Sequence, residues 1–365
     1  MPFIFRTFLT IGITYFYNLI FMDTFGRNFR ISVFGESHGA GIGVVLDGVP
    51  AGIVLTQSDF ETDMAMRKSG ARGTTPRLED DSPEILSGLH AGHTTGAPLA
   101  VLFRNNNTRS SDYTLFREVP RPGHADFVAG VKWNDFNDPR GGGHFSGRVT
   151  LALVAAGVVA KKVLESAGVV VSARLTAVGG VAESAVAGRE GECDPSVLWR
   201  EVIDKAISDG DSLGGVVECS AENVPVGLGE PFFDSVESLV SHIVFSIPGV
   251  RGIEFGDGFK AAAMKGSVHN DPLESSSGES SRNGAGGVNG GISNGNPIVF
   301  RVAFKPTSSI RKVQHTYNFT SGKISSLEIP GRHDVCFALR TPVIVEASAA
   351  IVLADLLLTS DFYKR

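Results

Sequence analysis

The sequence has few cysteines and no excess of positive charge. Its 365 residues include only Cys193, Cys219 and Cys336, which lie far apart and lack the close spacing of a metal site. A sparse, odd set of this kind argues against a disulfide-stapled fold and indicates reduced thiols in a reducing compartment. The net charge of −6 argues against a nucleic-acid coat protein, so any anion site must come from a local concentration of arginine.

The common nucleotide-binding motifs are also missing, because the sequence contains no P-loop pattern. A dinucleotide fingerprint begins within Gly35–Gly43, but Val44 stands where its third glycine should be, and a strand-like run follows where it needs a helix. What remains is a turn that presents Glu36, Ser37 and His38 at the end of a strand. A single loop histidine is usually a surface residue, but the glycines here clear space around the imidazole.

Apolar residues dominate positions 1–21, which also carry Gly, Thr and Asn and lack a small-residue cleavage pattern. A second methionine, Met22, opens a polar run. We interpret residues 1–21 as an artefact of where translation was assumed to start, with Met22 as the true first residue, rather than as a membrane anchor or a signal. The length permits one large domain or two ordinary ones, and we expect the protein in the cytoplasm.

The most informative stretch is Asn134–Arg148, in which three consecutive glycines, Gly141–Gly143, lie between Arg140 and Arg148. Glycine has no Cβ, so the backbone can meet a ligand directly. The apolar segment 149–165 is long enough for a helix, whose free N–H groups and positive dipole end would face whatever lies over the glycines. With the arginines, this predicts an anion site. The alternative is a glycine-rich connector whose arginines face water.

Two further polar segments support chemistry on an anion. The turn Arg121–Asp126 projects Arg, His and Asp around a Pro-Gly pair, and Arg67–Arg72 is a cationic cluster. Such clusters usually complement a helix dipole in solvent, but they would also suit a phosphate or a carboxylate. Together with His38, His124 and Asp334, the arginines predict chemistry on a polyanionic small molecule. Arginines would bind it, and imidazoles would transfer protons near neutral pH.

The remaining pattern predicts a mixture of helices and strands, without internal repeats or a coiled coil. Thr56 and Asp59 resemble a capping box, and Asp234 with Glu237 is expected to cap another helix. Residues 266–297 are rich in Ser and Gly, cannot bury a core and are interpreted as a mobile surface loop, with an interdomain linker as the alternative. Helices are expected at 56–68, 149–165, 194–208, 234–247 and 342–358, and strands at 30–34, 44–46, 99–103, 169–178, 216–221 and 298–304.

A series of short motifs runs along the chain: Gly35-Glu36-Ser37-His38-Gly39, Arg121-Pro122-Gly123-His124-Ala125-Asp126, Asp138-Pro139-Arg140-Gly141-Gly142-Gly143, Gly227-Leu228-Gly229-Glu230-Pro231, Gly256-Asp257-Gly258-Phe259, Gly290-Gly291-Ile292-Ser293, Lys305-Pro306-Thr307-Ser308-Ser309 and Gly331-Arg332-His333-Asp334. In set and order they resemble the chorismate synthase family, over about Phe25–Leu358. The resemblance implies an α+β fold, a single-domain β-α-β sandwich with helices packed between antiparallel sheets, assembled as a homotetramer. It makes 22–365 one catalytic domain and 266–297 a loop that closes over the site.

The resemblance also implies a reaction. The family is a lyase that converts 5-enolpyruvylshikimate 3-phosphate to chorismate and phosphate by anti-1,4-elimination, the last common step of the shikimate pathway and of aromatic amino acid biosynthesis. It requires reduced FMN without net redox change. We expect a monofunctional enzyme that receives reduced FMN from an external flavin reductase, with NADPH only as the indirect source of reducing equivalents. We expect no metal, nucleic acid or membrane partner.

Two other classes of function stay open from the residues alone. One is a flavin-dependent oxidoreductase that acts on a phosphorylated small molecule. The other is a non-catalytic phosphometabolite-binding protein.

The resemblance assigns roles to individual residues. It makes His38 the proton donor to the departing phosphate and His124 the partner of the reduced flavin ring. Asp334, with Ser37 and Ser146 as relays, would handle the proton passed through the flavin. The arginines expected to grip the substrate's phosphate and carboxylates are Arg67, Arg72, Arg121, Arg148 and Arg332. The expected flavin contacts are His144, Phe145, Ser146, Pro248, Gly249, Gly290, Lys305, Pro306, Thr307, Ser308, Ser309 and Arg332.

Two positions depart from the family's pattern. His144 stands where the family usually carries arginine after the glycines, and Lys68 replaces an arginine of the cationic cluster. A neutral imidazole is a weaker anion ligand than a guanidinium. We therefore expect reduced affinity for flavin or phosphate rather than lost activity.

Overall fold

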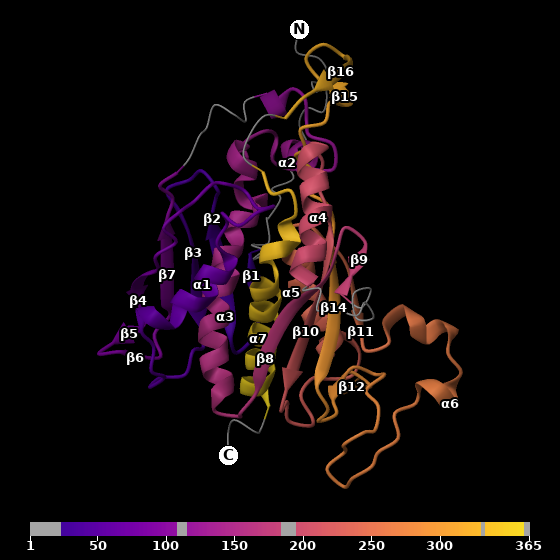
Figure 1. Cartoon of the computed structure of the whole chain (residues 1–365). Helices are drawn as coiled ribbons and strands as arrows, with labels where there is room; N and C mark the ends of the chain where they lie inside the picture. Colours follow the sequence, from indigo (N-terminus) through magenta and orange to yellow (C-terminus); the bar gives the residue numbers. More distant parts are fainter. Residues whose placement is uncertain (1–22, 108–114, 184–194, 330–332, 361–365) are drawn as a thin grey trace, which may run out of the picture.

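Two almost wholly apolar helices, α3 (Thr150–Glu165) and α7 (Pro342–Thr359), pack against each other at the centre of the fold (Figure 1). The computed structural model describes residues 23–107, 115–183, 195–329 and 333–360, with 195–198 as backbone only. Both helices are buried on nearly every side, as expected of helices that are hydrophobic all round. Gly157 of α3 permits the close contact, because a Cβ there would lie 2.3 Å from the Cβ of Ala347 on α7.

An antiparallel sheet covers each side of this helical layer. The first sheet has the strand order β1-β2-β3-β7-β4 and packs on α3, while the second has the order β11-β14-β10-β8-β9 and packs on α7 and α5 (Figure 1). The predicted β-α-β sandwich is therefore confirmed. The strands are β1 (Thr24–Phe25), β2 (Arg30–Gly35), β3 (Gly41–Asp47), β4 (Glu84–Ser87), β7 (Leu99–Arg104), β8 (Val170–Val178), β9 (Val181–Ala182), β10 (Gly215–Glu222), β11 (Val250–Phe255) and β14 (Ile298–Phe304).

The other elements are shorter and lie around the sandwich. The helices are α1 (Glu61–Arg67), α2 (Asp126–Trp133), α4 (Pro195–Ser208), α5 (Val236–Ser246) and α6 (Gly266–His269). Short 3₁₀-helical segments cover Gln57–Phe60, Gly147–Val149, Phe232–Asp234, Gly258–Ala263 and Phe337–Arg340. Arg140–Phe145 is an irregular turn in which Gly141, Gly142 and Gly143 have non-helical backbone angles. Three small hairpins pair β5 (Leu89–His90) with β6 (His93–Thr94), β12 (Val288–Asn289) with β13 (Ile292–Ser293), and β15 (Gln314–Asn318) with β16 (Lys323–Leu327).

Helix α7 is long and apolar enough to cross a membrane by length and composition. It instead lies between α3 and the second sheet, and 78% of its most apolar window is buried inside the protein. We therefore identify it as the core helix of the sandwich.

The predicted elements are confirmed in their main positions, with two corrections at helix starts. Helix α5 is capped by Ser235 rather than Asp234, because the Ser235 hydroxyl accepts the N–H of Ser238 at 3.0 Å. The polar turn that ends at Asp126 continues directly into helix α2, which the sequence pattern did not predict. The expected capping residue Asp194 lies outside the described residues.

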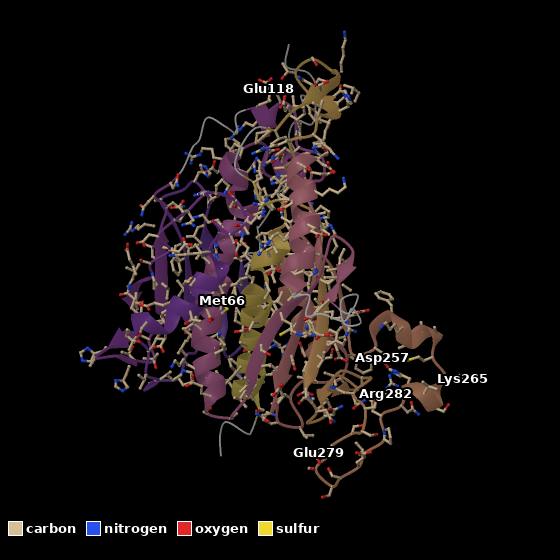
Figure 2. All side chains as sticks on the ribbon, viewed as in Figure 1. Met66, Glu118, Asp257, Lys265, Glu279 and Arg282 are labelled. Carbon is tan, nitrogen blue, oxygen red and sulfur yellow. The ribbon has the colours of Figure 1, made fainter. Side chains whose placement is uncertain are left out.

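The segment 266–297 projects from the second sheet, at the lower right of Figure 1. Arg282 pairs with Asp257 at its base (Figure 2), and the Asp271 carboxylate accepts the N–H groups of Gly284 and Ala285 at 2.8 Å each. Val288 belongs to the main hydrophobic core. The prediction that this segment contributes no residue to the core is therefore wrong at Val288. Its mobility stays a prediction.

We expect Gly157→Ala to destabilise the fold. The added Cβ would collide with Ala347, so α3 and α7 must separate, and overpacking of this kind costs about 1–3 kcal/mol. Gly266→Ala is the matched control, because a Cβ there meets nothing within 4 Å. Denaturant unfolding should show a lower free energy of unfolding for the first variant only. Equal stability of wild type and Gly157→Ala would show that the two helices do not depend on this contact.

Candidate functional site

The turn Gly141–Gly143 brings the two predicted histidines together. Its glycines have φ angles of 62°, 82° and 52°, values that residues with a Cβ rarely adopt. A Cβ at Gly141 would lie 2.2 Å from Nδ1 of His38, and a Cβ at Gly142 would lie 3.4 Å from Nε2 of His124. Successive glycines therefore border the two imidazoles, and the approach of His38 is possible only because Gly141 has no side chain.

His38 lies in the β2–β3 turn, which is bonded to the glycine turn. The Ser37 N–H donates to the Gly143 carbonyl at 3.1 Å, and the His38 Nδ1 lies 3.2 Å from the Ser37 hydroxyl. Arg77 donates to the hydroxyl and to the carbonyl of Ser37, at 3.0 and 3.2 Å. Burial, together with the guanidinium groups of Arg77 and Arg140, lowers the pKa of His38 to about 4. The imidazole is therefore neutral at neutral pH.

His124 is held by a buried carboxylate. Its Nδ1 lies 2.6 Å from Oδ1 of Asp126. Asp126 also accepts three hydrogen bonds from Arg121, from Nε at 2.7 Å, from Nη2 at 2.8 Å and from the backbone N–H at 3.1 Å. Burial alone would raise the pKa of Asp126, but the hydrogen bonds from Arg121 and His124 hold it well below its ordinary value. Burial also lowers the pKa of His124, so this imidazole too is neutral at neutral pH.

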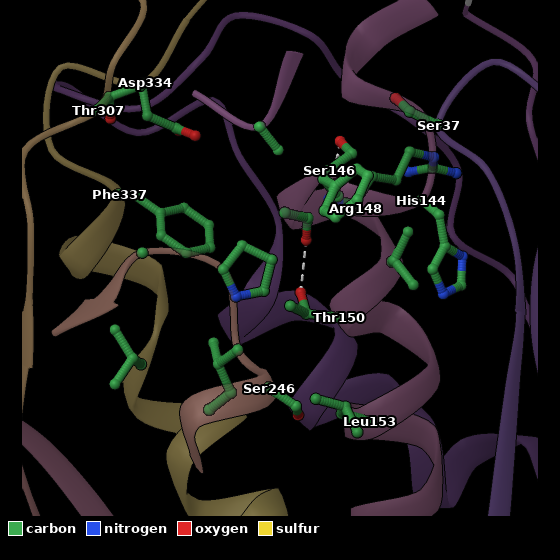
Figure 3. Close-up of a pocket in the computed structure, with 18 of the residues that line it drawn as sticks. Ser37, His144, Ser146, Arg148, Thr150, Leu153, Ser246, Thr307, Asp334 and Phe337 are labelled. Atoms are coloured by element: carbon green, nitrogen blue, oxygen red, sulfur yellow. Dashed lines mark hydrogen bonds between the residues drawn. The ribbon is translucent and has the colours of Figure 1, made fainter. Parts of the chain in front are cut away.

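Both turns border one cavity of about 810 Å³, a volume typical of small-molecule and cofactor sites. In the view of Figure 3, Thr307 and Asp334 lie on one side, Ser37 and His144 on the other, and Ser146 and Arg148 between them. Cations outnumber carboxylates in the lining, so the cavity favours an anionic ligand. The cations are Arg67, Lys68, Arg77, Arg121, Arg148, Arg251, Lys305 and Arg340, and the carboxylates are Asp23, Glu79, Asp81 and Asp334.

Several of these cations are held by carboxylates of the same lining. Arg148 donates from Nη1 to Asp81 at 2.8 Å and from Nε to the Asn105 side chain at 2.6 Å. Arg340 donates to Asp334 at 2.7 Å, and the N–H of Thr75 donates to the same carboxylate at 2.9 Å. These bonds fix the positions of the guanidinium groups and reduce their net positive charge.

Arg67 is less well satisfied than the other buried arginines of the cavity. It is only 2% exposed, its Nη2 makes a long 3.4 Å hydrogen bond to the Arg148 carbonyl, and its Nε has no hydrogen-bond partner within the described parts of the chain. Burial and the neighbouring Arg340 lower the pKa of Arg67 to about 9, so it remains cationic at neutral pH. Leaving a buried N–H unpaired is costly, and an anion in the cavity would satisfy it.

Most of the predicted site residues line this cavity, although they come from distant parts of the sequence. Among the predicted catalytic residues these are Ser37, His124, Ser146 and Asp334, and among the predicted arginines Arg67, Arg121 and Arg148. The predicted flavin contacts in the lining are His144, Phe145, Ser146, Pro248, Gly249, Lys305, Pro306, Thr307, Ser308 and Ser309.

Three predicted residues that the structure describes, His38, Arg72 and Gly290, are not in the lining. His38 lies directly behind Gly141, next to Ser37. Arg72 is exposed and pairs with Asp204, and Gly290 lies in the turn of the β12–β13 hairpin. Arg332 is outside the described residues.

The predicted closing loop is also absent from the lining. None of the residues 266–297, all of which the structure describes, borders the cavity. In this single chain the segment therefore does not cover the site.

The two residues that depart from the family's pattern, His144 and Lys68, both border the cavity but lie in different surroundings. His144 places Nδ1 2.7 Å from the Gly35 carbonyl and Nε2 3.2 Å from Asp23. It therefore connects the glycine turn to the first sheet while bordering the cavity. Lys68 is exposed at the cavity wall, where its charge is available to a ligand.

The sequence reasoning missed three residues that hold the site together. Asp126 was noted only as part of a polar turn, although its position two residues after His124 was a usable signal. Arg77 and Arg340 lie outside the motifs, and their contacts with Ser37 and Asp334 depend on chain segments that meet only in the fold.

We expect His38 to remain neutral in the ligand-free protein down to pH 5.5. Its unfolded-state pKa is near 6.5 and its folded pKa is about 4, so the unfolded chain binds more protons between these values. Stability should therefore fall as the pH drops through this window. An NMR titration of the ring signals, assigned with His38→Asn, checks this.

The cause of the lowered pKa can be tested in the same titration. Arg140→Gln should raise the midpoint, whereas Arg72→Gln, which removes an exposed arginine outside the cavity, should leave it unchanged. A wild-type midpoint near 6.5 would contradict the assigned environment of His38.

Comparison with known proteins identifies the family of the chain. Residues 29–358 match the sequence model of a family described as chorismate synthase. The chorismate synthase of Chitinophaga pinensis is 58% identical over 337 residues, which cover 92% of this chain and 97% of that protein. The chorismate synthase of Dehalococcoides mccartyi strain BAV1 is 44% identical over 358 residues, covering 94% and 98%.

A solved structure gives the same result for the fold. A crystal structure of chorismate synthase matches with a TM-score of 0.69 and 28% sequence identity, over 92% of this chain and 93% of that one. The chain therefore belongs to the chorismate synthase family.

Proposed function

We propose that this shikimate-pathway lyase converts 5-enolpyruvylshikimate 3-phosphate to chorismate and phosphate by anti-1,4-elimination, with reduced FMN bound in the cavity. The observation that carries the proposal is the Gly141–Gly142 turn with His38 and His124 against it, beside a cavity rich in arginine. A substrate with one phosphate and two carboxylates needs several fixed cations. Loss of phosphate and of a proton needs groups that donate and accept protons near neutral pH.

The donor set of the cavity suits a flavin mononucleotide. Phe337, Val250 and Phe145 provide apolar surface for a flat ring, and the buried Thr307 hydroxyl has no hydrogen-bond partner among the described residues. The Nε of Arg67, which has no partner in the described parts of the chain, is suited to a phosphate or carboxylate oxygen. Reduced FMN, when bound, would supply the electron chemistry that side chains lack, without net oxidation or reduction of the reactants.

We assign His38 to the departing phosphate. In the ligand-free site, burial, Arg77 and Arg140 keep this imidazole neutral. A phosphate dianion beside it would offset the two guanidinium charges and raise its pKa, so that His38 could carry a proton and donate it to the leaving oxygen. The Ser37 hydroxyl, 3.2 Å from Nδ1 of His38, would orient the ring.

The opposite side of the cavity is assigned to the flavin and to the proton lost from the substrate. His124 would place its Nε2 toward the flavin ring, next to Gly142. Asp334, fixed by Arg340 and by the Thr75 N–H, would take part in removing the substrate proton, with Ser146 as a relay. Arg67, Arg121 and Arg148 would bind the anionic groups of the substrate.

The predicted contacts of Arg72, Arg332 and Gly290 are not among the described residues of the cavity lining. Arg72 would have to leave Asp204 to reach a ligand. The roles proposed for Arg332 and Gly290 rest on the family's motifs alone.

The remaining features of the proposal rest on the family pattern. We propose a homotetramer in the cytoplasm that receives reduced FMN from an external flavin reductase. NADPH would enter only as the source of reducing equivalents for that reductase.

We expect His38→Ala and His124→Ala each to lower turnover by about 10²-fold or more, as is typical for loss of a general acid or base. The assay is anaerobic incubation of the purified protein with photoreduced FMN and the phosphorylated substrate, with chorismate as the measured product. His90→Ala is the matched control, because His90 is exposed on β5, outside the cavity lining. Wild-type turnover in either site variant would contradict its assigned role.

The same assay separates the competing functions. An elimination leaves reduced FMN unconsumed after many turnovers. Stoichiometric consumption of reduced FMN would indicate an oxidoreductase, and binding of the substrate without any product would indicate a binding protein.

A further inference from the structure

We infer that Asp126 is a positioning residue, which fixes the ring orientation and the tautomer of His124 so that Nε2 is the proton-accepting nitrogen beside Gly142. The consequence for turnover rests on the proposed function, whereas the tautomer itself does not. No motif or role in the sequence analysis assigns this task to Asp126.

The hydrogen-bond geometry determines which ring nitrogen of His124 carries the proton. Two groups approach its Nδ1, the Asp126 carboxylate at 2.6 Å and the Arg121 Nη2 at 3.1 Å. A carboxylate only accepts and a guanidinium only donates, so Nδ1 cannot satisfy both. The contact with the carboxylate is the shorter, and at 2.6 Å a carboxylate oxygen would repel an unprotonated ring nitrogen. Nη2 of Arg121 keeps its hydrogen bond to the same carboxylate at 2.8 Å when Nδ1 does not accept from it. Nδ1 therefore carries the hydrogen, and Nε2 keeps its lone pair.

The Asp126 carboxylate is itself held in place. Its side chain is 7% exposed and that of Arg121 is 4% exposed. Arg121 lies 4.4 Å from the centre of the Phe116 ring and donates from Nη1 to the Ser309 hydroxyl at 3.2 Å. Because the guanidinium is fixed from both sides, the carboxylate that it binds cannot rotate freely. The chain of contacts from Phe116 to His124 therefore fixes the angle at which the imidazole faces the cavity.

An amide in place of the carboxylate should reverse the tautomer. In Asp126→Asn, the position of Oδ2 still faces two obligatory donors, the Nε and the backbone N–H of Arg121. The position of Oδ1 faces a single obligatory donor, the Nη2 of Arg121, and the adaptable His124 ring. The introduced side-chain amide therefore has the lowest energy when its NH₂ group faces His124. The ring would then accept at Nδ1 and carry its hydrogen on Nε2, and the nitrogen beside Gly142 would lose its lone pair.

The direct test is the ¹⁵N NMR spectrum of the whole protein labelled at its histidine rings, with the His124 signals assigned by His124→Gln. We expect wild-type His124 to carry its proton on Nδ1, and Asp126→Asn to carry it on Nε2. A wild-type ring protonated at Nε2 overturns the inference, and this readout needs neither activity nor a folded variant.

Kinetics provide the second readout. Asp126→Asn should lower kcat by about 10²-fold or more while KM for the substrate changes less than about fivefold, because the cations of the cavity remain. Asp209→Asn, which changes an exposed carboxylate paired with Lys205, should behave as wild type. An unchanged tautomer with unchanged kcat in Asp126→Asn overturns the inference. Absence of chorismate from wild type would instead refute the proposed function and leave the tautomer assignment standing.

Discussion

The approach of the His38 imidazole to the bare backbone of Gly141 is the contact on which the site depends. It requires a residue without Cβ, with a positive φ, in the turn that leads into α3. Helix α3 is buried against α7 and the first sheet, so the core of the sandwich determines where this turn lies. The bond from the Ser37 N–H to the Gly143 carbonyl then connects the glycine turn to the β2–β3 turn, which carries His38. The core thereby positions the His124 imidazole at the cavity and the His38 imidazole directly behind Gly141.

Charge pairing divides the cations of the cavity into two groups. Arg121, Arg148 and Arg340 are bound by carboxylates and therefore keep fixed positions. Arg67 is buried, and its Nε finds no partner among the residues that the structure describes, whereas Lys68 is exposed at the wall. The paired arginines give the site its shape, and the incompletely satisfied cations give it affinity for anions. Substitution of a paired arginine would leave its buried carboxylate without that partner. Such variants would therefore change the stability of the protein as well as its affinity for ligands.

Local signals in the sequence predicted the two long apolar helices and the polar turns, whereas the sandwich and the flavin contacts were predicted through the motifs that resemble the chorismate synthase family. Continuous apolar runs marked α3 and α7, and glycines beside histidines marked the polar turns. The sequence could not predict the partners of these side chains. The bonds from Arg77 to Ser37, from Arg340 to Asp334 and from His144 to Gly35 depend on how distant segments meet. Arg72 and Gly290 carry matching residue types, but in this chain their elements place them outside the cavity lining.

The central claim is that a side chain at Gly141 displaces His38 and disables the site without unfolding the protein. Gly141→Ala adds a Cβ 2.2 Å from the imidazole at a φ of 62°, whereas Gly168→Ala adds one at a φ of 69° where nothing lies within 4 Å. The two variants share the same backbone strain, of order 1 kcal/mol, and differ in the contact with His38. The decisive measurement is the anaerobic turnover of both variants with reduced FMN and the phosphorylated substrate. Our account predicts a loss of about 10²-fold or more for Gly141→Ala and near-wild-type turnover for Gly168→Ala, and equal turnover of the two would contradict it.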